Sequence, residues 1–216
     1  MTSRPHGAPV SDRLRQGKVI AVLRAKAVDD LLPVCDVLVE ERIPSLEFTL
    51  TTPNLLDRLP ELVDRYGSVA DVGVGTVLDT AAAASAMDSG ANYLVTPSMN
   101  LDIVNAAVGR SVPVYPGGLT PTELWSGWQA GASAVKIFPA QTVGAKYLQH
   151  LRGPFPDLLA VPSGGVDLEA TGDWLRAGAV AVSLGGPLLG DALAGGDLGA
   201  LRERCRSVRR VVDEAR

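Results

Sequence analysis

The chain has 216 residues, of which 46% are hydrophobic and 20% charged, and its formal net charge is −4. This length suits one large domain, and the hydrophobic fraction allows a full core, which argues against a disordered chain. The negative net charge argues against a nucleic-acid surface that depends on long-range attraction. We therefore expect a single domain over residues 13–216, preceded by a flexible tail over residues 1–12.

Short apolar runs alternate with longer segments of helical composition along the whole chain. The expected strands are Val19–Leu23, Ser45–Leu50, Ala70–Val74, Tyr93–Thr96, Pro113–Tyr115, Ala134–Phe138, Leu158–Val161 and Val180–Leu184. The expected helices are Val28–Glu41, Asn54–Tyr66, Thr80–Ser89, Leu101–Val108, Thr122–Ala130, Lys146–Leu151, Leu168–Ala177 and Leu198–Ala215. Alternating strands and helices form parallel sheets covered by helices. Eight such units predict an α/β fold, a single-domain (β/α)8 TIM barrel.

A doubly wound open sheet is the alternative architecture. It is disfavoured because Leu23-Arg24-Ala25-Lys26 follows the first strand, where a dinucleotide-binding fold has a glycine-rich turn. Helix starts carry plausible N-caps at Asp29, Thr52, Asp79, Asn100, Thr120 and Asp167, and glycines stand where helices should end, at Gly90, Gly131 and Gly178. The arginine-rich end of the chain, from Arg202 to Arg210, is typical of the exposed face of an amphipathic helix.

The sequence also carries no sign of export or membrane insertion. The segment from Met1 to Val10 lacks the apolar region of a secretory signal, and no apolar stretch reaches the roughly 18 residues that span a bilayer. Cys35 and Cys205 lie far apart in helical segments, which argues against a disulfide framework. We expect a soluble cytoplasmic protein that binds neither membranes nor nucleic acid.

Lys136 is the most informative residue, because it lies within the apolar, strand-like run Ala134–Phe138. The other lysines, Lys18, Lys26 and Lys146, stand in polar or boundary contexts. Loss of solvation favours the neutral amine over the ammonium, and a neutral amine can condense with a carbonyl group to form a Schiff base. The alternative is a lysine whose stem lines the strand while its ammonium reaches water.

Other candidate residues stand at expected strand ends, where barrel enzymes carry their chemistry. Glu47 alternates with Leu46 and Phe48, so it can face the barrel interior and transfer protons beside Lys136; the alternative is an exposed carboxylate at the barrel mouth. Arg24 follows the first strand, and its guanidinium could hold a carboxylate or simply pack across the mouth.

Two glycine pairs, Gly164-Gly165 and Gly185-Gly186, follow the last two expected strands. Their backbone N–H groups could bind an anionic end of a substrate, although turn glycines would look the same. His6 lies in the tail and His150 in a polar helix, so the sequence offers no metal-ligand spacing and no Ser–His–acid triad. We expect no metal and no cofactor.

Seven short motifs, taken together in their order and spacing, are highly specific. They are Val19-Ile20-Ala21-Val22-Leu23-Arg24, Leu46-Glu47-Phe48-Thr49-Leu50-Thr51, Gly73-Val74-Gly75-Thr76-Val77-Leu78, Pro116-Gly117-Gly118-Leu119-Thr120-Pro121-Thr122-Glu123, Lys136-Ile137-Phe138-Pro139-Ala140, Gly153-Pro154-Phe155-Pro156 and Pro162-Ser163-Gly164-Gly165-Val166. From Val19 to about Leu189 the chain resembles the class I 2-keto-3-deoxy-6-phosphogluconate (KDPG) / 4-hydroxy-2-oxoglutarate (KHG) aldolase family.

The resemblance implies a homotrimeric barrel without a cofactor, a carbon–carbon lyase. Its substrate would be a KDPG-like 2-keto-3-deoxy-6-phospho sugar acid or 4-hydroxy-2-oxoglutarate, which it would cleave to pyruvate and glyceraldehyde 3-phosphate or glyoxylate. Lys136 matches the Schiff-base lysine and Glu47 the proton-transferring carboxylate. The matching substrate-binding residues are Arg24 and Thr76 for the pyruvyl carboxylate, Pro97 and Phe138 for the pocket walls, and Ser163, Gly164 and Gly165, with the second pair Gly185 and Gly186, for the distal phosphate.

The chain departs from the family pattern at four positions. Thr51 stands where many members have arginine, Ser163 replaces the usual threonine, and Gln141 replaces a glutamate. Pro187 stands where a serine commonly binds phosphate, and proline offers neither a hydroxyl nor an N–H. An unphosphorylated keto acid is therefore an alternative substrate. A phosphate-binding isomerase barrel and a non-catalytic keto-acid-binding trimer are alternative functions, and the sequence does not separate substrates that differ in configuration at C4.

Overall fold

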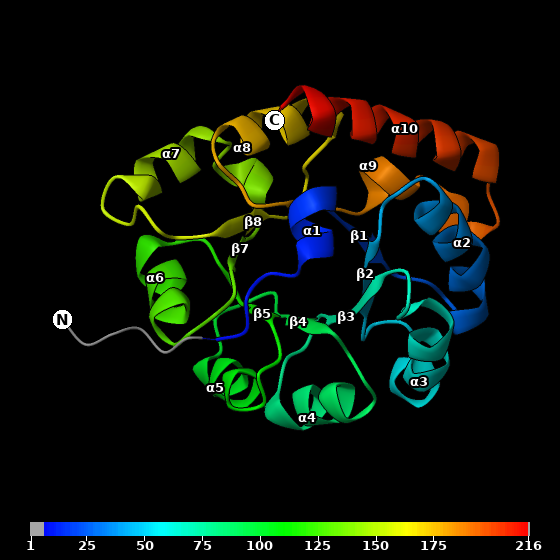
Figure 1. The fold of residues 1–216 in the computed structure, drawn as a ribbon, viewed down its shortest axis with the longest axis horizontal. Coiled ribbons are helices and arrows are strands. Elements are labelled where there is room, and N and C mark those ends of the chain that lie inside the picture. The colour runs from blue at the N-terminus through cyan, green and yellow to red at the C-terminus, as the bar shows by residue number, and fades with distance from the viewer. Residues whose placement is uncertain (1–6, 216) are drawn as a thin grey trace.

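The fold is a curled, mostly parallel sheet with helices around its outside, seen in a computed structural model that describes residues 7–215 (Figure 1). The strands are β1 (Val19–Leu23), β2 (Ser45–Thr49), β3 (Asp71–Gly75), β4 (Tyr93–Val95), β5 (Val114–Tyr115), β6 (Gly117–Gly118), β7 (Val135–Ile137), β8 (Ala160–Pro162) and β9 (Val182–Leu184). One sheet has the order β5-β4-β3-β2-β1-β9 and a second has the order β6-β7-β8.

The two sheets approach each other at two places. Only Pro116 separates β5 from β6, and a parallel bridge joins Ser163, just after β8, to Ser183 in β9. Proline has no N–H to donate, so it interrupts a ladder of backbone hydrogen bonds. The α/β class expected from the sequence is confirmed, with a curled parallel sheet.

The helices follow the strands in alternation. They are α1 (Asp12–Gly17), η1 (Val28–Leu31), α2 (Leu32–Glu40), α3 (Leu55–Tyr66), α4 (Thr80–Asp88), α5 (Leu101–Gly109), α6 (Pro121–Gln129), η2 (Ala140–Thr142), α7 (Lys146–Arg152), α8 (Leu168–Arg176), α9 (Gly186–Leu189), η3 (Ala192–Ala194) and α10 (Leu198–Glu214). Every strand and helix expected from the sequence is present, with ends that move by at most two residues. No helix in the described part of the chain is long and apolar enough to cross a bilayer.

Most of the expected helix ends are confirmed. Side chains at Asp79, Asn100, Thr120 and Asp167 accept hydrogen bonds from the first turns of α4, α5, α6 and α8. Gly90, Gly131 and Gly178 have positive φ. The expectation was wrong at Asp29 and Thr52, because Asp29 lies inside η1, which follows Ala27, and Asn54 directly precedes α3. Pro33, a residue suited to a helical first turn, is the second residue of α2, which follows η1 directly.

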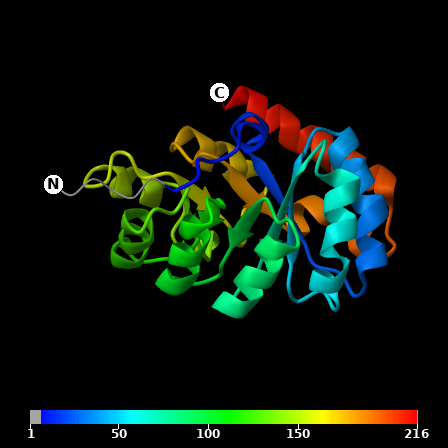
Figure 2. The same cartoon turned by 60° about the horizontal axis from the view of Figure 1, so that its bottom comes forward.

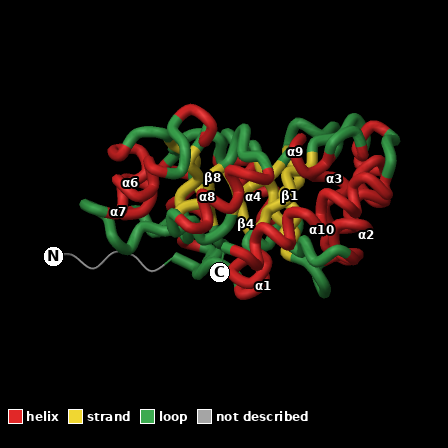
Figure 3. Tube along the Cα trace, turned by 90° about the horizontal axis from the view of Figure 1, so that it is seen from above, coloured by secondary structure: helices red, strands yellow, loops and turns green. Residues whose placement is uncertain are grey.

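A second apolar cluster fills the end of the sheet where the strands begin. Val10 and Leu14, 2% and 1% exposed, pack there with Tyr93, Tyr115 and other strand residues. Figures 2 and 3 show α1 at this end of the strands, and Figure 3 shows α9 at the opposite end. Val10 thus packs against the sheet, although it lies within the tail expected over residues 1–12, of which residues 1–6 lie outside the described ones.

Candidate functional site

A cavity of about 270 Å³ opens where the strands end. Every residue that the sequence nominated for the site lines it: Arg24, Glu47, Thr76, Pro97, Lys136, Phe138, Ser163, Gly164, Gly165, Gly185 and Gly186. These residues come from segments spread over most of the chain. Parallel strands bring them together, because all their carboxyl ends lie at the same edge.

Lys136 lies at the centre of β7, between β6 and β8. Its N–H donates to the carbonyl of Pro116 at 2.8 Å, and it pairs with Gly117 on one side and Val161 on the other. The residue is 7% exposed, and its Nζ lies 5.0 Å from the ring centroid of Phe138. The backbone ladder therefore fixes where the amine enters the cavity, and the Phe138 ring provides a cation–π contact for its charged form.

Glu47, in β2, is 1% exposed and faces the same cavity. Burial raises the pKa of its carboxyl group, while the charge of Lys136, a hydrogen bond from Ser183 and the charge of Arg24 oppose that rise. The Ser183 hydroxyl donates to Oε2 of Glu47 at 3.4 Å. A buried carboxyl group with a raised pKa beside an amine can exchange protons with a bound molecule.

Ser183 is a site residue that the sequence analysis missed. It stands between Val182 and Leu184 in β9, so a polar side chain interrupts an apolar strand. That interruption was the available signal, and it is the same kind of signal that singled out Lys136.

Gly75, at the end of β3, makes room for Glu47. A Cβ added at Gly75 would lie 2.1 Å from Oε1 of Glu47, closer than any van der Waals contact allows. The next residue, Thr76, has φ +59, a left-handed conformation that costs a non-glycine residue about 1–2 kcal/mol. Strain of this kind clusters at binding sites, where the surrounding structure holds it.

Threonine side chains hold the segment that carries Arg24. The Thr49 hydroxyl donates to the carbonyl of Leu23 at 3.2 Å, and the Thr52 hydroxyl accepts from the N–H of Ala25 at 3.2 Å. These bonds fix the backbone on both sides of Arg24, whose exposed side chain also lines the cavity.

The glycine pair after β8 lies close to other site residues. Gly164 and Gly165 have φ of +87° and +72°, and an added Cβ would meet the Phe138 ring at 2.9 Å and the Gln141 side chain at 2.0 Å, respectively. Only glycine fits both the positive φ and the close approach of these side chains, and both glycines line the cavity. Pro187 also lines the cavity, and it contributes no N–H.

Among the residues that the structure describes, no histidine or cysteine side chain lines this cavity. Cys35 and Cys205 are buried free thiols elsewhere in the domain, and His6 lies outside the described residues. Within residues 7–215, no group of three or more histidine, cysteine, aspartate or glutamate side chains could hold a metal ion.

Comparison with known proteins gives a consistent result. Residues 10–202 match the family described as KDPG and KHG aldolase. The chain is 33% identical over 171 residues to a 2-dehydro-3-deoxy-6-phosphogalactonate aldolase of Escherichia coli (strain K12), covering 79% of this chain and 83% of that protein. It is 31% identical over 196 residues to the KHG/KDPG aldolase of the same organism, covering 89% and 91%.

A solved structure shares the fold and adds a chemical detail. The KDPG aldolase of Legionella pneumophila superposes with a TM-score of 0.84 at 26% identity, covering 91% of this chain and 96% of that chain. That structure is described as holding pyruvate captured at low pH as a covalent carbinolamine intermediate.

Proposed function

The chain belongs to the KDPG and KHG aldolase family of carbon–carbon lyases, and we propose that Lys136 forms a Schiff base with the keto group of a 2-keto-3-deoxy sugar acid. The observation that carries this proposal is the pair of buried side chains in one cavity, the Lys136 amine and the Glu47 carboxyl group. The covalent carbinolamine of the Legionella pneumophila relative supports the same chemistry.

The proposed reaction starts when the neutral amine of Lys136 attacks the C2 carbonyl carbon to form a carbinolamine. Loss of water gives a protonated imine, which draws electrons from the C3–C4 bond. Glu47 accepts the proton of the C4 hydroxyl group as that bond breaks, and the aldehyde leaves. The enamine that remains is protonated at C3, and water then releases pyruvate and restores the amine.

The other cavity residues suit the two ends of such a substrate. Arg24 and Thr76 bind the carboxylate next to the keto group, while Pro97 and Phe138 form the walls. For the distal end, the available groups are the hydroxyl of Ser163 and the open backbone of Gly164-Gly165 and Gly185-Gly186. The relatives' names support a phosphorylated acid, whereas Pro187 favours an unphosphorylated one.

We also infer a closed eightfold barrel, a homotrimer and a cytoplasmic location. The near contact of the two sheets, at Pro116 and at the bridge between Ser163 and Ser183, supports closure if β5 and β6 count as one interrupted strand. The family resemblance supports the trimer and the location. Sedimentation of the purified protein tests the trimer directly.

The decisive experiment is borohydride reduction in the presence of pyruvate, followed by mass mapping of the modified peptide. We expect one reduced pyruvyl adduct, on Lys136, and none in the Lys136→Arg variant, which should also lose turnover. Lys146→Arg is the matched control, because it removes another lysine that does not line the cavity. A folded wild-type sample that forms no adduct would exclude the Schiff-base mechanism.

A further inference from the structure

Two glycines of β3 create adjoining spaces on the face of the sheet that carries the site cavity. A Cβ added at Gly73 would lie 2.1 Å from Cζ of Tyr93, and a Cβ added at Gly75 would lie 2.1 Å from Oε1 of Glu47. Neither glycine has a positive φ, so these positions need glycine for space and not for backbone conformation. One space therefore holds the ring of Tyr93, and the next holds the carboxyl group of Glu47.

Tyr93, in β4, lies beside Glu47 on the side where the strands begin. The register pairs Glu47 with Gly73 and Gly73 with Tyr93, so the three residues stand in line across β2, β3 and β4. The Tyr93 ring passes over Gly73, and its hydroxyl oxygen accepts a hydrogen bond from the Ser45 hydroxyl at 3.2 Å. Ser45 precedes Glu47 by two residues and shares its face of β2. The ring thus lies beneath the Glu47 side chain, which extends the other way, toward Gly75.

The Tyr93 ring is itself enclosed by protein. Tyr93 is 2% exposed, Ser45 is fully buried, and the ring of Tyr115 packs against that of Tyr93 with centroids 5.3 Å apart. Burial raises the pKa of the Tyr93 phenol well above its ordinary value, and the charges of Glu47, Tyr115 and Asp71 raise it further. A phenol that stays protonated neither accepts nor supplies the proton of the reaction. Tyr93 can therefore act on Glu47 only through its position.

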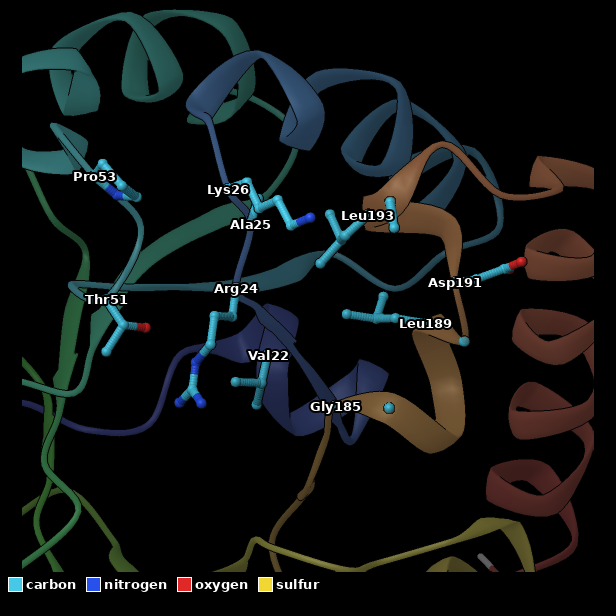
Figure 4. Close-up of a pocket in the computed structure, with 13 residues that line it drawn as sticks. Val22, Arg24, Ala25, Lys26, Thr51, Pro53, Gly185, Leu189, Asp191 and Leu193 are labelled. Atoms are coloured by element: carbon cyan, nitrogen blue, oxygen red, sulfur yellow. The ribbon is translucent and has the colours of Figure 1, made fainter.

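The groups that act on the pKa of Glu47 by charge or hydrogen bonding come from other segments. They are Lys136 of β7, Ser183 of β9 and Arg24 after β1, and all three lower this pKa, whereas burial raises it. Lys26, two residues after Arg24, extends away toward Leu193 and does not line the site cavity (Figure 4). The uncharged ring of Tyr93 adds to the burial of Glu47 without adding a charge.

We propose that Tyr93 is a positioning residue for the reaction, because its ring is the floor that confines the Glu47 carboxyl group to its space over Gly75 and shields it from water on the side where the strands begin. This inference rests on the proposed role of Glu47 as the base. Removal of the ring lets water approach the carboxylate and stabilise its charge, so the pKa of Glu47 falls. The hydroxyl of Tyr93 serves to anchor the ring to Ser45.

The test compares profiles of kcat/KM against pH for the cleavage of KDPG and 4-hydroxy-2-oxoglutarate. Tyr93→Leu removes the ring and should move the acid limb to lower pH, because a better hydrated base loses its proton at lower pH. On the plateau of the profile kcat should fall about fivefold, since the carboxyl group is confined less closely. Tyr93→Phe keeps the ring and should leave both the acid limb and kcat as they are in the wild type.

Tyr115→Leu is the matched control. It removes another tyrosine ring from the same apolar cluster, and Tyr115 is 1% exposed, so the cost of the lost packing is comparable. Tyr115 lies on β5, one strand further from Glu47 than Tyr93. The control should lower the denaturation midpoint as Tyr93→Leu does but leave the acid limb in place.

The outcomes separate this inference from the proposed function. An acid limb that stays in place in Tyr93→Leu, or that moves equally in Tyr115→Leu, would overturn the role of the ring. Tyr93→Phe preserves the packing and decides the question even where Tyr93→Leu fails to fold, because an unmoved limb supports the ring and a moved limb assigns the effect to the hydroxyl instead. Borohydride should still trap pyruvate on Lys136 in every folded variant, so these results leave the aldolase proposal standing. A wild-type protein that traps no pyruvate would contradict both proposals.

Discussion

Burial removes the Glu47 carboxylate from water, which costs solvation free energy. It also raises the pKa of the carboxyl group, which suits proton transfer. The raised pKa of its carboxyl group comes first from burial, while Lys136, Ser183 and Arg24 stabilise the carboxylate form. In the unfolded chain the Glu47 carboxyl group lacks this burial and these neighbours, and it has the ordinary glutamate pKa of about 4.3. The folded protein therefore binds this proton more tightly than the unfolded chain does, and the pKa of the Glu47 carboxyl group depends on three identified neighbours.

Replacing Ser183 by Ala should move the acid limb of the activity profile to higher pH. The hydroxyl of Ser183 donates to Glu47 and lowers its pKa, so its loss raises that pKa further. As pH falls, the base is then protonated earlier and kcat/KM declines earlier. Profiles of kcat/KM against pH for the two proteins provide the measurement, and an unchanged or lower acid limb would contradict the assignment of Glu47 as the base.

Gly75→Ala tests whether the space beside Glu47 is needed for activity. The new methyl group overlaps Oε1 of Glu47, so the carboxylate must move and kcat should fall about 100-fold, since catalytic geometry tolerates little displacement. Gly73→Ala is the matched control in the same strand, because its methyl group meets the Tyr93 ring instead. Both changes overpack the interior of the curled sheet and should cost about 1–3 kcal/mol of stability. Equal activity in the two folded variants would count against a role for the position of Glu47.

The short helix α9 contributes Gly186 and Pro187 to the lining of the site cavity, and the last helix of the chain holds it in place. Arg204 of α10 donates through Nε to the carbonyl of Leu188 at 2.7 Å and through a terminal nitrogen to that of Leu189 at 2.8 Å. These carbonyls end α9, where no further helical N–H is available. The arginine-rich helix that the sequence indicates is therefore more than an exposed face, because one of its arginines positions the segment that starts at Gly185.

Arg204→Ala should loosen α9 and raise KM more than it lowers kcat. Loss of two charge-assisted hydrogen bonds should cost about 1.5–3 kcal/mol of stability. Arg204→Lys restores the charge and should recover part of both effects. Arg210→Ala is the control within α10, since that side chain bonds only to Ser207 among the described residues. Urea unfolding and steady-state kinetics provide the measurements, and a variant with unchanged KM would show that Arg204 does not position α9.

The domain as a whole is a curled sheet with two different ends. At the end where the strands finish, the site cavity gives small molecules access to Lys136 and Glu47. At the end where strands begin, Val10 and Leu14 pack into the second apolar cluster and α1 covers it. This separation leaves the packing of one end free to provide stability while the other end provides chemistry.

Leu14→Ala should destabilise the domain without changing its chemistry. Leu14 is 1% exposed, and removing a buried leucine side chain costs about 2–5 kcal/mol through lost burial and a residual cavity. The denaturation midpoint should fall, while kcat/KM of the folded fraction stays the same. Leu78→Ala, at a leucine that is 61% exposed, should change the free energy of unfolding by less than about 0.5 kcal/mol. Similar costs at both positions would contradict the role of α1 as a cover.

The sequence by itself determined the order of strands and helices and the residues that gather at the strand ends. It could do so because these features depend on local periodicity, on capping side chains and on the rule that parallel strands share one carboxyl edge. A charged residue within an apolar strand, Lys136, directed attention to the strand ends, and the structure places it in one cavity with the other nominated residues.

Only the tertiary structure decided which side chains modify one another and which spaces remain open. The hydrogen bond from Ser183 to Glu47 joins residues 136 positions apart. Likewise, Val10 packs with Leu14 in the second apolar cluster, although the sequence predicts that the tail extends to residue 12. Contacts of this kind depend on the packing of distant elements, and local sequence patterns carry no record of the distances between those elements.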